Sequence, residues 1–151
     1  MLRGVNVSLS ESDGVSIRKL LEPMNFSAYC WKIDRDESYG ENDQSLFPLE
    51  DTINGEEVNH SIKHGDSYTI YFLDMKAFPS EADMLEIETY HDFLESACEI
   101  IILVADGAYI EIYAKDFVLL KDIYENALKN SIEKVEYITE ENDGRTRMTV
   151  W

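Results

Sequence analysis

Alternating apolar and polar residues predict that β-strands make up much of this chain. Val5, Val7 and Leu9 alternate with polar neighbours over residues 4–9, which is typical of a strand with one buried face. Similar alternating, aromatic or β-branched runs recur along the sequence. They predict further strands over residues 28–33, 68–75, 99–105, 108–114, 134–139 and 145–151, and a weaker one over 84–88.

Two short turns predict that neighbouring strands pair as antiparallel hairpins. Asp106-Gly107 separates two apolar runs, and Asp-Gly in this position is typical of a tight type I′ turn. The run before it, residues 99–105, is apolar on both faces, which favours a central strand. Asn142-Asp143-Gly144 predicts a second hairpin, between the last two expected strands.

Apolar residues at helical spacing predict three or four helices. The strongest stripe follows Asp116, a favourable N-cap, over residues 117–130, and it consists of Phe117, Leu120, Tyr124, Ala127 and Leu128. Shorter helices are expected over residues 15–21, capped by Ser10 or Ser12 and ended by Pro23, over residues 55–64 before Gly65, and directly after the capping residue Thr89.

These elements predict an α+β fold in a single domain that spans residues 1–151. We expect a mostly antiparallel sheet of about six to eight strands, with three or four helices packed mainly on one face. The composition is 44% hydrophobic and 11% aromatic, which suits a buried core. The sequence shows no internal repeat, linker or low-complexity tract that would divide the chain.

The charge of the chain is strongly acidic and unevenly distributed. The formal net charge is −18, and residues 34–100 hold eighteen acids against three bases, a balance of −15. Residues 34–49 mix acidic residues with Ser, Gly and Asn, so we expect a loop there. Such a block is typical of a solvated face or of an interaction surface, and the sequence leaves both alternatives open.

If the block is an interaction surface, a basic protein is the partner that its charge favours. The residues that we predict to bind such a partner are Asp34, Asp36, Glu37, Tyr39, Glu41, Asp43, Glu56 and Glu57. The same charge argues against nucleic acid and anionic membranes, which attract basic surfaces. With no apolar segment long enough to span a bilayer and no secretory signal pattern, a cytoplasmic location is expected.

Tests for known catalytic or metal-binding patterns return no match. Counted from Asp34 as a calcium loop, the sixth position is Tyr39 and the twelfth is Ser45, where Gly and Glu are required. Cys30 and Cys98 lie in apolar contexts typical of buried thiols. We therefore predict no cofactor and no metal, and a non-enzymatic role is favoured. The alternative is a small enzyme or ligand-binding domain with a cleft near His60, His64 and His91.

The C-terminal residues 136–151, EYITEENDGRTRMTVW, together with residues 100–113, are distinctive. They resemble a family of uncharacterised small acidic proteins, a domain of unknown function, from Bacillus-type bacteria and their phages. The resemblance implies a cytoplasmic bacterial protein and supplies no site residues. Combined with the charge, it makes a binding module for a basic protein our prediction, and a toxin-neutralising, immunity-like protein is its sharpest form.

Overall fold

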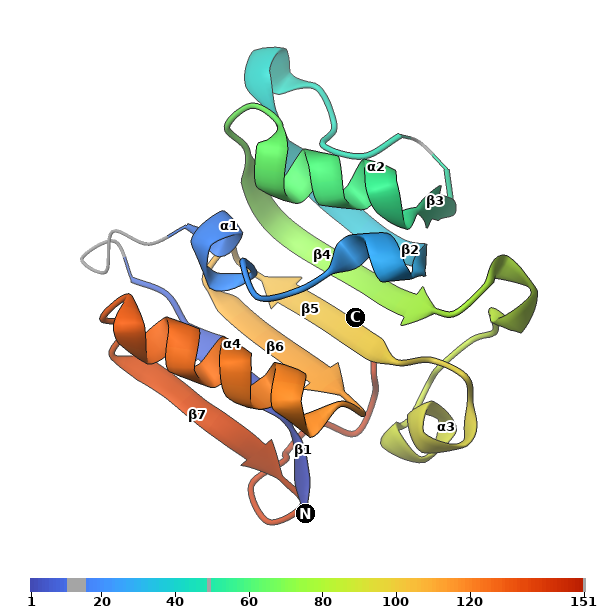
Figure 1. Cartoon of the computed structure of the whole chain (residues 1–151), viewed down its shortest axis with the longest axis vertical. Helices are drawn as coiled ribbons and strands as arrows, with labels where there is room; N and C mark the ends of the chain where they lie inside the picture. Colours follow the sequence, from blue (N-terminus) through green and yellow to red (C-terminus); the bar gives the residue numbers. More distant parts are fainter. Residues whose placement is uncertain (11–15, 49, 151) are drawn as a thin grey trace.

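The computed structural model describes residues 1–10, 16–48 and 50–150. Within them, seven strands form one antiparallel sheet in the order β3-β2-β4-β5-β6-β1-β7 (Figure 1). The strands are β1 Leu2–Ser8, β2 Cys30–Tyr39, β3 Thr52–Asn54, β4 Thr69–Phe78, β5 Ile100–Ala105, β6 Tyr109–Ala114 and β7 Lys134–Thr139. The predicted α+β class is confirmed.

The helices of the described residues are mostly short. They are α1 Ile17–Leu20, α2 Gly55–Asn59, α3 Tyr90–Glu95 and α4 Phe117–Lys129, and α2 continues as a π-helical turn, η4 His60–His64. Single 3₁₀ turns form η2 Phe26–Ala28, η3 Glu41–Asp43 and η5 Glu81–Asp83. No helix of the described part is both long and apolar enough to cross a membrane.

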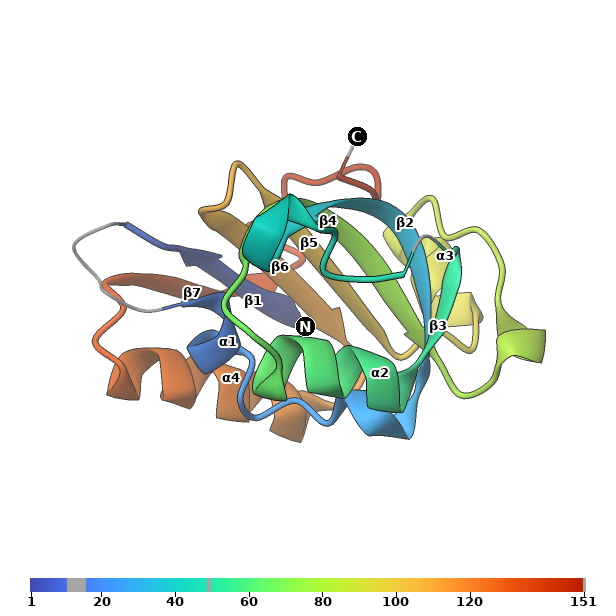
Figure 2. The same ribbon diagram turned by 90° about the horizontal axis from the view of Figure 1, so that it is seen from above.

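The larger core lies on the face of the sheet that α1, α2 and α4 cover. Leu20, Val58 and Ile123 from these helices pack in one cluster with Ile102 and Ile112 from the central strands. Figure 2 shows α2 and α4 on this side of the sheet and the C-terminal segment on the other. Of the stripe predicted for α4, Leu120 and Ala127 are buried, whereas Phe117 and Leu128 lie half exposed at the two ends.

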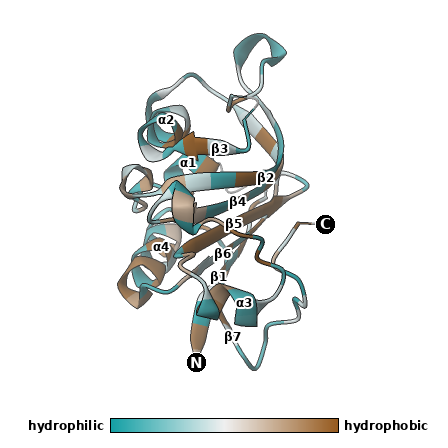
Figure 3. Ribbon diagram, turned by 90° about the vertical axis from the view of Figure 1, so that its right-hand side faces the viewer, coloured by the Kyte–Doolittle hydropathy of each residue, from teal (hydrophilic) through white to brown (hydrophobic). Residues whose placement is uncertain are grey.

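The second face carries a smaller core that residues distant in sequence complete. Ile101 and Tyr113 of the sheet pack there against Phe93 of α3 and against Met148 and Val150 near the C-terminus. Because both faces are covered, β5 is apolar on both sides, and Figure 3 shows it as an almost continuous hydrophobic strand in the middle of the sheet.

Local signals identified the central hairpin and most helix starts. Asp106 and Gly107 have φ of 53° and 68°, so the predicted turn with two positive φ values is confirmed. Thr89 and Asp116 cap α3 and α4 as predicted. The first helix, however, is capped by Ser16, not by Ser10, and Ser12 lies outside the described residues.

The loop expected over residues 34–49 was wrong for its first part, because β2 continues to Tyr39. Charged residues have a low strand propensity, which is why the sequence favoured a loop. The sheet overrides this preference: Arg35 lies opposite Asp74 in the neighbouring β4, and bulges near Asp34 and Ser38 adjust the register.

The strand expected over residues 84–88 and the described part, 145–150, of the strand expected over 145–151 are absent from the described sheet, and Trp151 lies outside the described residues. A single backbone bond, from Met148 N–H to the Glu88 carbonyl at 2.8 Å, joins the two segments. Where the second hairpin was expected, the Asn142 side chain bonds to the backbone at the end of β7. It accepts from Thr139 N–H at 2.8 Å and donates to the Tyr137 carbonyl at 2.9 Å.

Candidate interaction surface

Asp34, the first of the predicted partner-binding acids, lies at the surface but is engaged by two lysines of the sheet. Its carboxylate accepts from the Lys76 ammonium at 2.7 Å and also pairs with Lys32. Burial acts to raise the pKa of Asp34, but the hydrogen bonds and charges of Lys32 and Lys76 outweigh it and lower the pKa. This carboxylate is therefore committed to the fold.

Asp36 and Glu37 also have neighbours within β2. The Ser38 hydroxyl donates to Asp36, and burial raises the pKa of Asp36 in spite of that bond. Glu37 accepts from Arg35 Nε at 2.9 Å, and the Arg35 guanidinium lies 4.4 Å from the centre of the Phe72 ring. These two acids contribute negative charge to the surface, but each already accepts a hydrogen bond within β2 and is less available to bind another protein.

Tyr39, by contrast, presents its ring to solvent. Its side chain is 43% exposed and lies against Tyr71, which is 50% exposed, with the ring centroids 6.0 Å apart and the planes at 61°. Glu41 and Asp43 follow on η3, and both are exposed. Three of the eight predicted residues are thus accessible at one end of the sheet.

The turn between β5 and β6 adds a fifth residue to this end of the sheet. Gly107 N–H donates to the Tyr71 carbonyl at 2.9 Å, so the turn is fastened to the strand that carries the ring. Asp106, the residue before Gly107, is exposed. We call Tyr39, Tyr71, Asp106, Glu41 and Asp43 the Tyr39–Tyr71 surface.

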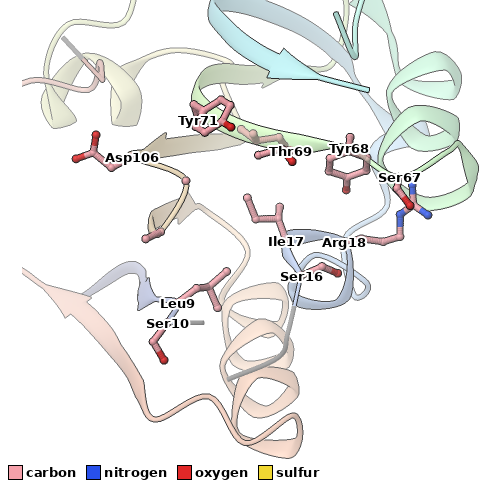
Figure 4. Close-up of a pocket in the computed structure, with 13 residues that line it drawn as sticks. Leu9, Ser10, Ser16, Ile17, Arg18, Ser67, Tyr68, Thr69, Tyr71 and Asp106 are labelled. Atoms are coloured by element: carbon pink, nitrogen blue, oxygen red, sulfur yellow. The ribbon is translucent and has the colours of Figure 1, made fainter. Parts of the chain in front are cut away.

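An open pocket of about 560 Å³ adjoins this surface, and Tyr71 and Asp106 lie at one end of it (Figure 4). Arg18 lies at the opposite end. Its guanidinium donates to the carbonyls of Ile62 and Gly65, both at 2.8 Å, and to that of Asp66 at 2.9 Å. Arg18 thereby ties α1 to the end of η4, and its role is structural.

Glu56 and Glu57, the last two predicted residues, are exposed on a different element. They lie in the first turn of α2, where a helix N-terminus favours negative charge. Together with His60 and residues 45–48 they line a shallow groove of about 640 Å³. The predicted set therefore divides into the acids of β2, the Tyr39–Tyr71 surface and the start of α2.

The structure does not bring the three histidines of the alternative prediction together. His60 and His64 are exposed on η4, whose Ile62 belongs to the larger core. His91 is exposed on α3, which packs on the other face of the sheet, and it lies 3.3 Å from Glu95. Within the described residues, no group of three or more His, Cys, Asp or Glu side chains is arranged to hold a metal ion.

Both cysteines are free thiols, so no disulfide joins Cys30 to Cys98. Cys98 is fully buried, and burial raises its pKa to about 12, which keeps it protonated and unreactive at neutral pH. Cys30 is half-buried.

Sequence reasoning missed a buried ionic cluster on the second face. Lys76 is completely buried and pairs with Asp74 and Asp34, each at 2.7 Å, while the second Asp74 oxygen accepts from Val150 N–H at 3.2 Å. A second network joins Arg145 to Glu111 at 2.8 Å. Both networks hold the C-terminal segment against the sheet, so we assign them to the fold.

Comparison with known proteins gives a family without an assigned activity. The chain is 36% identical over 155 residues to "Uncharacterized protein YncE" of Bacillus subtilis (strain 168), covering 99% of this chain and 100% of the relative. No solved structure shows a significant match. Residues 2–149 match the family described as "Protein of unknown function (DUF2691)", and the chain belongs to that family.

Proposed function

We propose that this protein is a non-enzymatic binding module for a basic protein partner and that the Tyr39–Tyr71 surface is its docking site. The exposed pair of tyrosine rings carries the proposal. Exposed tyrosines are frequent anchors of protein interfaces, because they bury a large area with little loss of conformational entropy.

The charge around the rings supports a basic partner over an acidic or neutral one. Glu41 and Asp43 follow Tyr39 in the chain, Asp106 precedes the glycine that bonds to Tyr71, and all three are exposed. The whole chain carries a net charge of −18. A field of this sign speeds the approach of a cationic surface and disfavours anionic ones. A toxin-neutralising protein, which covers a basic functional surface of its target, is the sharpest form of this proposal.

The catalytic alternative has weaker support. Its three histidines lie on elements packed against opposite faces of the sheet, and the Cys98 thiol is buried with a raised pKa. A nucleophile and a base within hydrogen-bond reach of each other would favour catalysis, but the Cys98 thiol donates to the Ile100 carbonyl and the His91 imidazole lies against Glu95.

Site-specific photo-cross-linking in a Bacillus host tests the proposal. A photoreactive phenylalanine derivative replaces Tyr39, and the matched control replaces Phe117, a similarly exposed aromatic residue on α4. We expect a discrete adduct with a basic protein from position 39 and none from position 117. Equal adducts from both positions would contradict the proposal.

The captured protein is then purified and titrated against the unmodified chain. Because the attraction is electrostatic, its affinity should fall between about 0.01 M and about 0.15 M ionic strength, where the Debye length shortens from about 30 to about 8 Å. A Glu41→Gln, Asp43→Asn double variant should bind more weakly and depend less on salt. Unchanged affinity of that variant would remove the Tyr39–Tyr71 surface as the docking site.

A further inference from the structure

The chain itself shows how this fold binds guanidinium groups. Arg3 lies over the Tyr90 ring, 4.1 Å from its centre, and its Nη1 pairs with the Asp143 carboxylate at 3.1 Å. Arg35 is held in the same way, by the Phe72 ring and the Glu37 carboxylate. In both groups, an aromatic face and a carboxylate bind one arginine. The pairing is favourable because a guanidinium is flat, weakly hydrated and always charged.

The Tyr39–Tyr71 surface has the same two components. The two rings meet edge to face, an arrangement that leaves part of a ring face in contact with solvent. Asp106 supplies an exposed carboxylate on the turn that is bonded to the Tyr71 backbone. Among the described residues, no Lys or Arg side chain lies over either ring, and none forms an ion pair with Asp106.

The group formed by Arg35, Glu37 and Phe72 lies next to the Tyr39–Tyr71 surface in the sheet. Glu37 and Tyr39 lie on the same strand, β2, two residues apart, and Phe72 follows Tyr71 in β4. The Arg35 group and the two exposed rings therefore occupy successive positions on the same pair of strands. Tyr71 is the extra residue at the bulge between Phe72 and Ile70, so the Tyr39–Tyr71 surface adjoins the place where the protein already stacks an arginine.

We propose that Tyr39, Tyr71 and Asp106 form a subsite for an arginine side chain of the basic partner. This inference rests on the proposed function and makes its recognition chemistry specific. The arginine stacks on the exposed ring and its N–H groups donate to the Asp106 carboxylate. Lysine suits the subsite less well, because its ammonium is a strongly hydrated point charge that cannot stack or form a fork with a carboxylate.

Two synthetic peptides of equal length and charge, a glycine–arginine repeat and a glycine–lysine repeat, are the probes. Each is titrated into the ¹⁵N-labelled protein at low ionic strength, and backbone amide shifts give both the affinity and the location of binding. We expect the arginine peptide to bind more tightly and to shift the amides of Tyr39, Tyr71 and Asp106 most.

Single substitutions separate stacking from charge. Tyr71→Leu removes the ring but keeps an apolar side chain, and it should weaken the arginine peptide by about two- to fivefold while leaving the lysine peptide nearly unchanged. Asp106→Asn removes the carboxylate but keeps the turn, because Asn-Gly also favours type I′ geometry. It should weaken the arginine peptide and reduce its preference over lysine. The matched controls Phe117→Leu and Asp122→Asn, on α4, should leave both affinities unchanged.

The outcomes separate this inference from the proposed function. If both peptides bind equally at the Tyr39–Tyr71 surface, the arginine subsite is wrong while a basic docking surface stands. If the strongest shifts lie elsewhere, for example around Glu56 on α2, the subsite is also wrong. If neither peptide shifts these amides, the subsite is overturned, and the cross-linking experiment alone decides the proposed function.

Discussion

The substitution Lys76→Met tests the energetics of the second face most directly. The Lys76 side chain is completely buried, and its ammonium is 2.7 Å from both Asp74 and Asp34. Methionine matches the apolar stem in size but removes the charge. It leaves Asp74 buried, with the Val150 N–H as its remaining hydrogen-bond donor among the described residues.

Removing one partner of a buried ion pair costs about 3–5 kcal/mol, because the other charge remains without compensation. The free energy of unfolding of a typical native domain is about 5–15 kcal/mol, so the variant should lose a large part of its stability. In urea denaturation with an m value of about 2 kcal/mol per M, the midpoint should fall by about 2 M. A loss of less than about 1 kcal/mol in the free energy of unfolding would refute the buried pairing, because solvent-exposed ion pairs contribute only that much.

Two companion measurements identify the cause of the loss. In the double variant Lys76→Met, Asp74→Asn, no buried charge remains at Asp74, so part of the stability should return. Lys121→Met breaks the exposed pair with Glu125 and should cost less than about 0.5 kcal/mol.

The effect of Lys76→Met should also depend on pH. Burial already raises the pKa of Asp74, so this carboxyl binds a proton more tightly in the folded state than in the unfolded chain. The stabilisation from this group is present below its unfolded pKa and is lost as the pH rises through its folded pKa. Without Lys76 the folded pKa rises further. The stability gap between wild type and variant should therefore narrow as the pH falls from neutral through that pKa, and a gap independent of pH would contradict a charged Asp74.

Three further outcomes follow from single residues. Iodoacetamide should modify Cys30 before Cys98 in the native protein, because Cys98 is buried with a pKa of about 12. Equal modification rates of the two cysteines, measured by mass spectrometry, would contradict an inert environment for Cys98. Met148→Ala should destabilise by about 2–5 kcal/mol in thermal or urea unfolding, whereas Leu85→Ala, at a half-exposed position, should cost less than about 1 kcal/mol. Asp116→Ala should cost about 1 kcal/mol, because its carboxylate caps α4 by accepting from two backbone N–H groups; an unchanged unfolding midpoint would contradict that role.

For some of the predicted partner-binding residues, the local sequence was enough to predict that the side chain is exposed. Tyr39, Glu41 and Asp43 lie where a strand ends in a polar turn, and they are exposed as expected. Tyr71 and Asp106 were missed, because one occurs within a strand-like run and the other looked like a turn residue only. Their proximity to Tyr39 depends on the order of β2, β4 and β5 in the sheet, which no local pattern encodes.

By itself, the sequence determined the local elements of this protein. Alternating, aromatic, β-branched or continuous apolar runs identified six of the seven strands of the described sheet, and turn and capping chemistry identified the central hairpin and the starts of α3 and α4. These features depend on interactions between residues a few positions apart, which a single sequence displays directly.

Only the tertiary structure decided which charges are buried and where the C-terminal segment lies. Lys76 is completely buried, and it pairs with Asp34 of the acidic block, forty-two positions away in the chain. Residues 145–150 resembled a strand, but the Asn142 side chain bonds to the backbone at the end of β7, and Arg145 and Val150 bond to groups on the second face. Both outcomes depend on contacts between distant residues, whose free energy exceeds local propensity once the sheet brings them together.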